Sequence, residues 1–231
     1  MTTLILDSAT EDVSAILTQD GKMLASYSRP GRPLLVLHDA IQQILLQYGK
    51  KITDLERVVV VQGPGSWTGL HVALATAKTI SQMVGCPISA VSFLDALAQS
   101  NANDDGVVCA MMDARQKRIY AGLYAMSGNG MKALIPGQLW DLEALISNLR
   151  DRTGQVTIVG SGAVAYQREL SGMPSNLTVL MAPSYKPEAL VEISLAAPKI
   201  LPDSEEFFAL SPLYMQADGA GPKLFSRKAQ C

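Results

Sequence analysis

The sequence has few of the residues that would assign it to a chemically specialised class of protein. It contains 3 cysteines and 2 histidines in 231 residues, and Cys86, Cys109 and Cys231 form neither a C-x-x-C pair nor a zinc-binding set. We therefore expect free thiols. No apolar stretch reaches the roughly 18 residues that a membrane helix requires, and the chain opens directly into an apolar strand without the pattern of a signal peptide. These absences predict a cytosolic protein that does not contact membranes.

The sequence also lacks a strong charge of one sign. It carries 19 basic and 21 acidic residues, which gives a formal net charge of −2. Proteins that hold nucleic acid by themselves usually concentrate basic residues on one surface, so we expect no such binding by this chain alone. Hydrophobic residues, in contrast, make up 48% of the sequence. They are sufficient for the core of one large domain or two small ones.

The most informative part of the sequence is a predicted strand, turn and helix. Four consecutive valines at 58–61 are typical of a strand that is buried on both faces. The segment Gly63–Ser66 ends this strand, because Pro64 has no N–H for a ladder and glycine favours turning. We predict a helix over 67–84 with Ser66 as its N-cap. A helix that starts after such a turn can bind an anion at its N-terminus, although turns of this kind can also simply require small residues. The candidate anion contacts here are Gly63, Gly65 and Ser66.

Two predicted helices, at 34–48 and 67–84, carry apolar surfaces that exceed what one sheet face requires. Small side chains recur every four residues in the second helix, which leaves a groove that another helix can approach closely. The wide apolar stripe of the first helix indicates burial on two sides. The neighbouring helix can belong to the same chain or to a second one. The predicted partner interface comprises Leu34, Leu37, His38, Ile41 and Leu45 from the first helix and Trp67, Gly69, Leu70, Ala73, Leu74, Ala77 and Ser81 from the second.

A polar segment at 101–106 separates two halves that share one predicted order of elements. In each half a strand ends on an aspartate, Asp7 or Asp113, two further strands follow, and helices then alternate with strands. Two copies of such a βββαβα unit make up the α/β, two-lobed actin-like fold (ribonuclease H-like, ASKHA). We therefore predict an N-terminal lobe over 1–103 and a C-terminal lobe over 104–231, whose final segment can pack back on the first lobe.

Three segments together resemble the bacterial TsaB family. They are LILDSATEDVSAIL at 4–17, GPGSWTGLHVALATAK at 63–78 and MMDARQKRIYAGLY at 111–124. Two positions depart from the family pattern, since Trp67 stands where phenylalanine is usual and His71 where arginine is usual. The resemblance implies an actin-like fold and a non-catalytic scaffold subunit that is required for the formation of threonylcarbamoyladenosine on tRNA.

The same resemblance implies the partners. The chain would bind and activate its metal- and nucleotide-binding paralogue TsaD, the small ATPase TsaE would join, and tRNA would be contacted only indirectly, through the complex. Alone, the chain is expected to form a homodimer, because an uncovered apolar patch of this size favours self-association. No cofactor, metal or catalytic residue is expected. Neither His38 nor His71 has a histidine or carboxylate four residues further on, as a metal-binding helix would.

Two enzymatic functions are alternatives. An actin-like kinase or ATPase needs a glycine hairpin after its first aspartate to hold phosphates, but the turns after Asp7 and Asp113 contain no glycine. Arg115, in the second turn, is a candidate nucleotide contact, and the alternative is a solvated basic turn. A peptidase that acts on its paralogue would use Ser66 as the nucleophile, but the sequence has no G-x-S-x-G elbow there.

Overall fold

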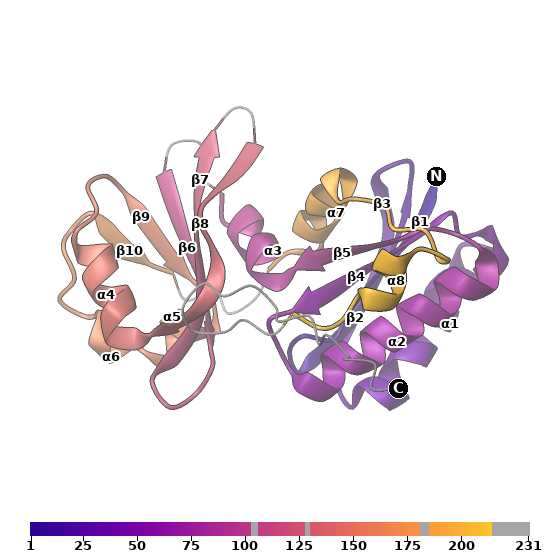
Figure 1. Ribbon diagram of the computed structural model, residues 1–231, viewed down its shortest axis with the longest axis horizontal. Helices are drawn as coiled ribbons and strands as arrows, with labels where there is room; N and C mark the ends of the chain where they lie inside the picture. The colour runs from indigo at the N-terminus through magenta and orange to yellow at the C-terminus, as the bar shows by residue number, and fades with distance from the viewer. Residues whose placement is uncertain (103–105, 128–129, 181–184, 214–231) are drawn as a thin grey trace, which may run out of the picture. The chain divides into compact units, whose positions relative to one another are not determined.

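The computed structural model describes residues 1–102, 106–127, 130–180 and 185–213. The chain forms two compact units (Figure 1). Unit 1 comprises Met1–Ala102 and Ser184–Pro212, and unit 2 comprises Asn103–Pro183 and Leu213–Cys231. Unit 1 is therefore built from two separate parts of the sequence. The two lobes predicted from the sequence, 1–103 and 104–231, stay a prediction as independent domains.

Unit 1 contains a five-stranded mixed sheet in the order β3-β2-β1-β4-β5. Its strands are β1 (Thr2–Asp7), β2 (Asp12–Gln19), β3 (Lys22–Pro30), β4 (Arg57–Gly63) and β5 (Ile88–Ser92). The first three strands pair antiparallel, and β4 and β5 continue the sheet from β1 in parallel. Asp20 and Gly21 join β2 to β3 with φ angles of 53° and 76°. A two-residue hairpin of the favoured twist requires such angles at both positions, so the short turn has a local cause in the sequence.

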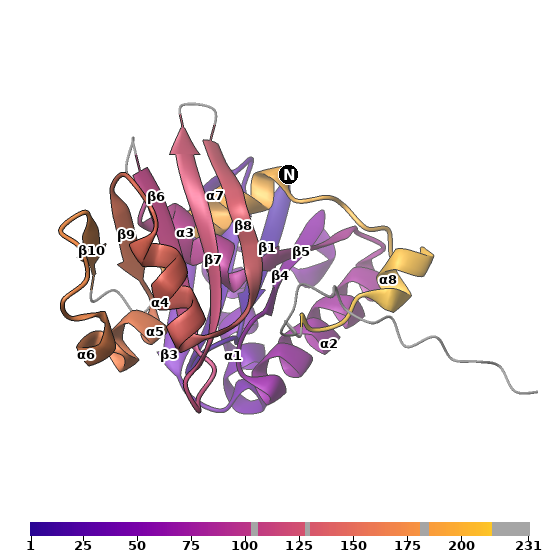
Figure 2. The same cartoon turned by 60° about the vertical axis from the view of Figure 1, so that its left-hand side comes forward.

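Helices cover both faces of this sheet (Figure 2). They are α1 (Pro33–Gln47), the short 3-10 helix η1 (Ile52–Asp54), α2 (Trp67–Val84), α3 (Phe93–Ser100), α7 (Pro187–Ala196) and α8 (Glu205–Ala209). The apolar sides of α1 and α2 share one core cluster with Leu4 and Leu6 of β1. Because side chains alternate along a strand, Ile5 points to the opposite face, where α3 and α7 pack on the sheet. The predicted bounds 67–84 are confirmed for α2, which ends at Gly85 in a left-handed conformation.

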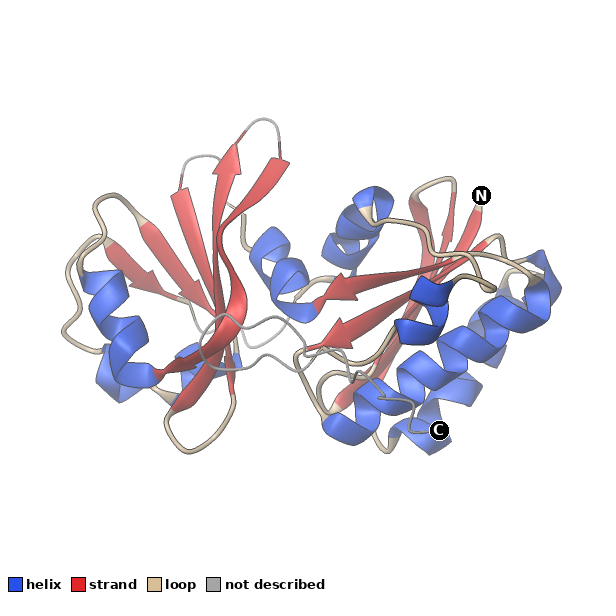
Figure 3. Ribbon diagram, in the orientation of Figure 1, coloured by secondary structure: helices blue, strands red, loops and turns tan. Residues whose placement is uncertain are grey.

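Unit 2 repeats the arrangement of the first sheet (Figure 3). Its elements are β6 (Gly106–Asp113), β7 (Arg118–Ser127), β8 (Gly130–Asp141), α4 (Leu142–Arg150), β9 (Val156–Val159), α5 (Ser161–Ala165), α6 (Gln167–Leu170) and β10 (Leu177–Val179). The order β10-β9-β6-β7-β8 matches that of unit 1 strand for strand, with β6–β8 antiparallel and β9 and β10 parallel to β6. The predicted duplication of a βββαβα unit is thus confirmed. In the described part of both units, no helix is long and apolar enough to cross a membrane.

The segment 185–212, here called the returning segment, passes from one face of the unit 1 sheet to the other. It begins with α7 on the face that also carries α3. Ile200 then forms a bridge with Ile88 at the free edge of β5, through two backbone hydrogen bonds of 2.9 and 2.8 Å. Beyond this edge Phe207 of α8 is buried in the cluster that contains α1 and α2. This core cluster therefore depends on Phe207, which follows its next nearest buried member in the sequence, Ile88, only after the whole of β6–β10.

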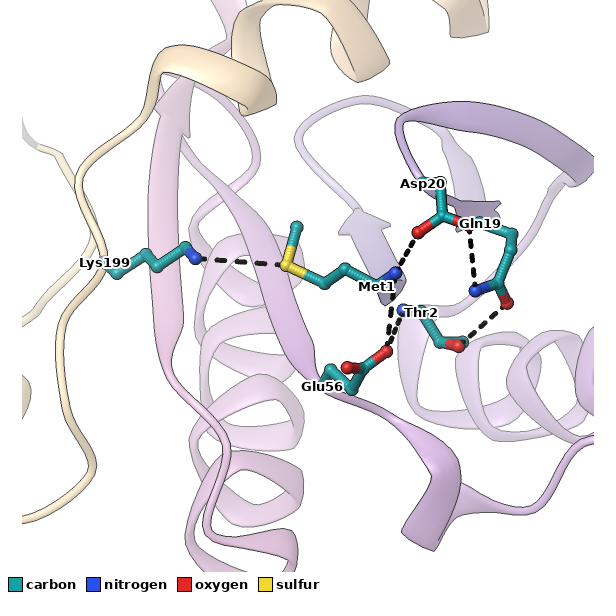
Figure 4. A network of polar contacts seen from close by, with 6 residues as sticks. All are labelled: Met1, Thr2, Gln19, Asp20, Glu56 and Lys199. Atoms are coloured by element: carbon teal, nitrogen blue, oxygen red, sulfur yellow. Dashed lines mark hydrogen bonds and ion pairs between the residues drawn. The ribbon is translucent and has the colours of Figure 1, made fainter.

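The returning segment also reaches the N-terminal end of β1 (Figure 4). The Lys199 ammonium lies 3.9 Å from the sulfur of Met1. The ammonium of Met1 contacts Asp20 and lies 3.6 Å from Glu56, which also accepts a 2.6 Å hydrogen bond from the N–H of Thr2. These contacts link the start of β1 to the β2–β3 turn and to the residue before β4.

Candidate functional site

The turn after β1 and the start of α2 pack backbone against backbone. The N–H of Ser66 donates to the carbonyl of Ala9 over 2.7 Å. A Cβ atom on Gly65 would lie 2.4 Å from that carbonyl oxygen, and one on Gly69 would lie 1.9 Å from the carbonyl oxygen of Ser8. Both distances are far below van der Waals contact, so the sequence needs glycine at these positions. The small residues of the turn thus have a structural cause that is independent of any ligand.

Asp7 is buried at the end of β1, and both of its carboxylate oxygens accept hydrogen bonds from unit 1. The N–H of Ala9 donates to one oxygen over 2.8 Å, and the hydroxyl of Tyr185 donates to the other. Burial raises the pKa of Asp7 to about 6, and these hydrogen bonds oppose that rise. Tyr185 opens the returning segment, and its pairing with Asp7 could not be inferred from sequence spacing. Among the described residues, no group of three or more histidine, cysteine or acidic side chains could hold a metal ion.

The candidate anion contacts lie in two different units. Gly63 is buried, whereas Ser66 is exposed and its hydroxyl accepts the N–H of Gly69 over 3.3 Å. Ser66 is therefore the N-cap of α2, as predicted. Arg115 belongs to unit 2 and is exposed in the β6–β7 turn. Anion binding at these residues stays a prediction.

The β6–β7 turn has an unusual backbone. Three consecutive residues without glycine, Arg115, Gln116 and Lys117, have left-handed φ angles of 65°, 53° and 59°. The Asp113 carboxylate accepts the N–H of Arg115 over 2.8 Å and the hydroxyl of Tyr166 over 3.1 Å, and this hydroxyl in turn accepts the N–H of Lys117 over 3.2 Å. These bonds fix the turn and leave its basic side chains exposed.

The structure buries most of the residues of the predicted partner interface within unit 1. In the single chain, nine of the twelve predicted interface residues are already buried in unit 1. They are Leu37, Ile41, Leu45, Gly69, Leu70, Ala73, Leu74, Ala77 and Ser81. The neighbour of the small residues is thus the same chain. Solvent reaches the other three, Leu34, His38 and Trp67, and a contact of these with a partner stays a prediction.

The outward sides of α1 and α2 form a surface with almost no charge, here called the α1–α2 face. Its large apolar side chains are Leu34, Leu35 and Leu46 of α1 and Trp67 and Met83 of α2, each exposed to 65% or more. The exposed positions between them are mostly glutamine and threonine. The two helices contain one acidic and one basic residue, Asp39 and Lys78. Asp39 lies 3.8 Å from Arg29, and the Lys78 ammonium binds backbone carbonyls of the returning segment. Both charges are therefore already engaged within unit 1.

Trp67 is held in place at the first turn of α2. Its ring lies 4.2 Å from the ring of His71, between centroids, with a tilt of 40°. The Nδ1 atom of His71 lies 2.8 Å from the Trp67 carbonyl oxygen. Because a carbonyl can only accept, Nδ1 carries the proton of this bond. The exposed indole is thereby fixed against its own helix, as an aromatic anchor at a protein interface needs to be.

The repeated sheets and their helices place the chain in the class of two-lobed actin-like proteins. Two solved structures support this fold. "YeaZ from Pseudomonas aeruginosa" superposes with a TM-score of 0.72 at 21% identity, and a second P. aeruginosa structure, described as an uncharacterized protein with similarity to peptidase YEAZ, superposes with a TM-score of 0.75 at 20% identity. Each superposition covers 93% of this chain and 99% of the other.

Sequence comparisons identify the family within this class. Residues 35–185 match the family model described as TsaD, tRNA N6-adenosine threonylcarbamoyltransferase. The chain is 28% identical over 163 residues to the Bacillus subtilis tRNA threonylcarbamoyladenosine biosynthesis protein TsaB, and 31% identical over 134 residues to that of Escherichia coli. These alignments cover 69% and 57% of this chain, and 71% and 58% of the relatives. The chain belongs to the family that the TsaD model describes, and within it the chain is similar to the proteins named TsaB.

Proposed function

We propose that this chain is a non-catalytic subunit in the biosynthesis of threonylcarbamoyladenosine on tRNA. It binds a TsaD-type threonylcarbamoyltransferase and holds it in its active arrangement. The named role of its TsaB relatives and its match to the TsaD family model support the pathway. The scaffold role is supported by a surface of the chain itself.

The observation that carries this proposal is the α1–α2 face. Five large apolar side chains are exposed there, and both charges of the two helices are engaged within unit 1. Depletion of charge and enrichment in aromatic and aliphatic side chains mark the centre of a protein interface, and an exposed apolar patch of this kind is unusual on a monomer. A paralogue built on the same fold can offer a similar pair of helices, so that four helices pack together.

The end of β1 also supports a non-catalytic role. An actin-like enzyme needs backbone N–H groups after its first aspartate to hold phosphate. Here the turn after Asp7 packs against Gly65 and Gly69, and both oxygens of Asp7 are hydrogen-bonded within unit 1. Contact with tRNA would then be made through the transferase.

The oligomeric states follow from the same face. Without the transferase, two copies of the chain would pack together through their α1–α2 faces and form a homodimer. The heterodimer with the transferase would replace this homodimer, because the same face cannot bind both partners at once. A TsaE-type ATPase would join the heterodimer. Sedimentation of the chain alone and with the transferase tests this exchange directly.

Reconstitution tests the proposed function. The transferase, its adenylate-forming enzyme, a TsaE-type ATPase and substrate tRNA are incubated with ATP, threonine and bicarbonate, with and without this chain, and the modified nucleoside is quantified. We expect modification to depend on the chain and to be lost with Trp67→Asp or Leu35→Asp. Leu134→Asp, which changes an exposed leucine of β8 in unit 2, is the matched control and should retain activity. Equal modification without the chain would refute the proposal.

A further inference from the structure

The returning segment places a second aromatic side chain beside α2. The ammonium of Lys78 binds the carbonyl oxygens of Phe208 and Leu210 over 3.3 and 2.8 Å, which holds the end of α8 against α2 (Figure 1). Phe207 is buried in the core, whereas Phe208 is 66% exposed and stands edge-on to it, with 5.6 Å between ring centroids. The lysine of α2 thus holds the backbone of Phe208, and the exposed ring of Phe208 packs against the buried ring of Phe207.

Three exposed carboxylates lie shortly before Phe208 in the sequence. Glu205 lies three positions before Phe208 and therefore on the same side of the helix, whereas Glu206 and Asp203 precede Phe208 at other spacings. None of the three forms an ion pair with any residue in the described ranges. Lys78, the cation that binds this segment, donates to backbone carbonyl oxygens, so within the described residues it does not pair with any of the three carboxylates. Acidic residues in a first helical turn favour the helix itself, but Asp203 lies outside α8 and has no such role.

We propose that α8 is a docking element for a basic protein surface, with Phe208 as the apolar anchor and the carboxylates as its rim. The complementary partner is an apolar pocket surrounded by lysine or arginine. RNA and anionic membranes are excluded as occupants by their negative charge. This inference rests on the proposed function. A transferase that binds tRNA must carry concentrated basic residues, and α8 adjoins α2 of the face proposed to bind it.

The test measures the affinity of the full-length chain for the TsaD-type transferase by calorimetry, at about 50 and about 500 mM sodium chloride. We expect Phe208→Ala to weaken binding about 10-fold at both salt concentrations. Glu205→Lys should weaken it about 5-fold at low salt and much less at high salt, because ions screen exposed charges. Circular dichroism checks that each variant is folded.

Two matched controls lie on the opposite face of the unit 1 sheet. Leu195→Ala removes another exposed apolar side chain of the returning segment, and Glu188→Lys reverses another glutamate in the first turn of a helix, α7. Both should bind like the wild type.

The outcomes separate this inference from the proposed function. If Trp67→Asp abolishes binding while Phe208→Ala and Glu205→Lys bind like the wild type, the docking role of α8 is overturned and the scaffold proposal stands. If these two variants disrupt the homodimer and leave the heterodimer intact, the occupant is a second copy of the chain and the basic-partner assignment is wrong. If the wild-type chain does not bind the transferase, both proposals fall.

Discussion

Asp7 is a carboxyl group that the fold buries at some cost to stability. Burial favours the neutral form and raises its pKa from 3.8 to about 6, although Tyr185 and the N–H of Ala9 donate hydrogen bonds to it. A rise of about two units corresponds to about 3 kcal/mol of disfavoured ionisation above pH 6. An exposed side chain at the end of β1 would avoid this cost.

The first prediction concerns the pH dependence that Asp7 causes. The folded state retains the proton to a higher pH than the unfolded chain does, so the free energy of unfolding falls as pH rises from about 4 to about 6. Asp7→Asn removes this loss. It should stabilise the protein by about 1–3 kcal/mol at about pH 7 and by almost nothing near pH 3.5. Urea unfolding at both pH values measures the difference. Asp12→Asn, at an exposed position of β2, is the control: the charge of Asp12 is only the smallest of the causes that act on the pKa of Asp7, so this variant should keep most of the wild-type pH dependence.

The second prediction concerns Gly69. A Cβ atom there would meet the carbonyl oxygen of Ser8 at 1.9 Å, and neither backbone can move without disturbing β1 or α2. Gly69→Ala should therefore destabilise the protein by about 3 kcal/mol, as measured by chemical unfolding. Gly85→Ala is the matched control. A Cβ atom on Gly85 would meet no other atom within 4 Å, but the φ angle there is 77°. Backbone strain alone should therefore lower the free energy of unfolding by about 1 kcal/mol. Equal losses would show that α2 and the β1 turn can separate.

At the scale of elements, the sequence predicts α2 because both of its ends have capping residues that can be recognised locally. Ser66 caps the first turn and Gly85 ends the last one in a left-handed conformation. The contacts of α2 could not be predicted in the same way. A stripe such as Ala73 and Ala77 shows that a close neighbour exists, but periodicity does not tell a neighbour in the same chain from one in a second chain. The structure answers this by burying the stripe inside unit 1.

Other elements escaped prediction for different physical reasons. Helix α8 has five residues, fewer than two turns, and is stabilised by the burial of Phe207 and by Lys78 of a distant helix. Strand β8 continues past Pro136 to Asp141, because it is an edge strand whose pairing with β7 resumes after that proline. Helices α5 and α6 are two short helices that meet at Tyr166, whose hydroxyl binds the β6–β7 turn. Each difference comes from contacts between distant residues.

The third prediction concerns the β6–β7 turn. A left-handed conformation costs a residue with a side chain about 1–2 kcal/mol, whereas glycine adopts it freely but loses more entropy on folding. Gln116, with a φ of 53°, is exposed, so Gln116→Gly should stabilise unit 2 by about 0.5–1 kcal/mol in thermal unfolding. Ala114 in the same turn has no positive φ, and Ala114→Gly should destabilise. If both variants destabilise, the turn is not strained at Gln116.

At the scale of the whole molecule, unit 1 is completed by a segment that follows most of unit 2 in the sequence. The returning segment contributes Phe207 to the core, Ile200 to the edge of β5 and the carbonyl of Ala197 to the guanidinium of Arg57. Arg57 is itself buried, and its other hydrogen bonds go to Ser89. Unit 1 therefore combines local contacts of residues 1–102 with contacts of high sequence separation, whose formation costs more loop-closure entropy.

The fourth prediction follows from this discontinuity. Phe207→Ala should destabilise unit 1 by about 3–5 kcal/mol, the usual cost of removing a buried aromatic side chain, although it changes a residue near the end of the described chain. Phe208→Ala changes the adjacent and largely exposed phenylalanine and should leave the free energy of unfolding within about 0.5 kcal/mol of the wild type. Hydrogen exchange locates the effect, since Phe207→Ala should weaken the protection of α1, α2 and β4 and leave that of β6 and β7 unchanged.

Equal stabilities of the two variants would mean that α8 does not complete the core. In that case residues 1–102 would hold unit 1 together without the returning segment, and α8 would lose the rigid base that its proposed docking role requires.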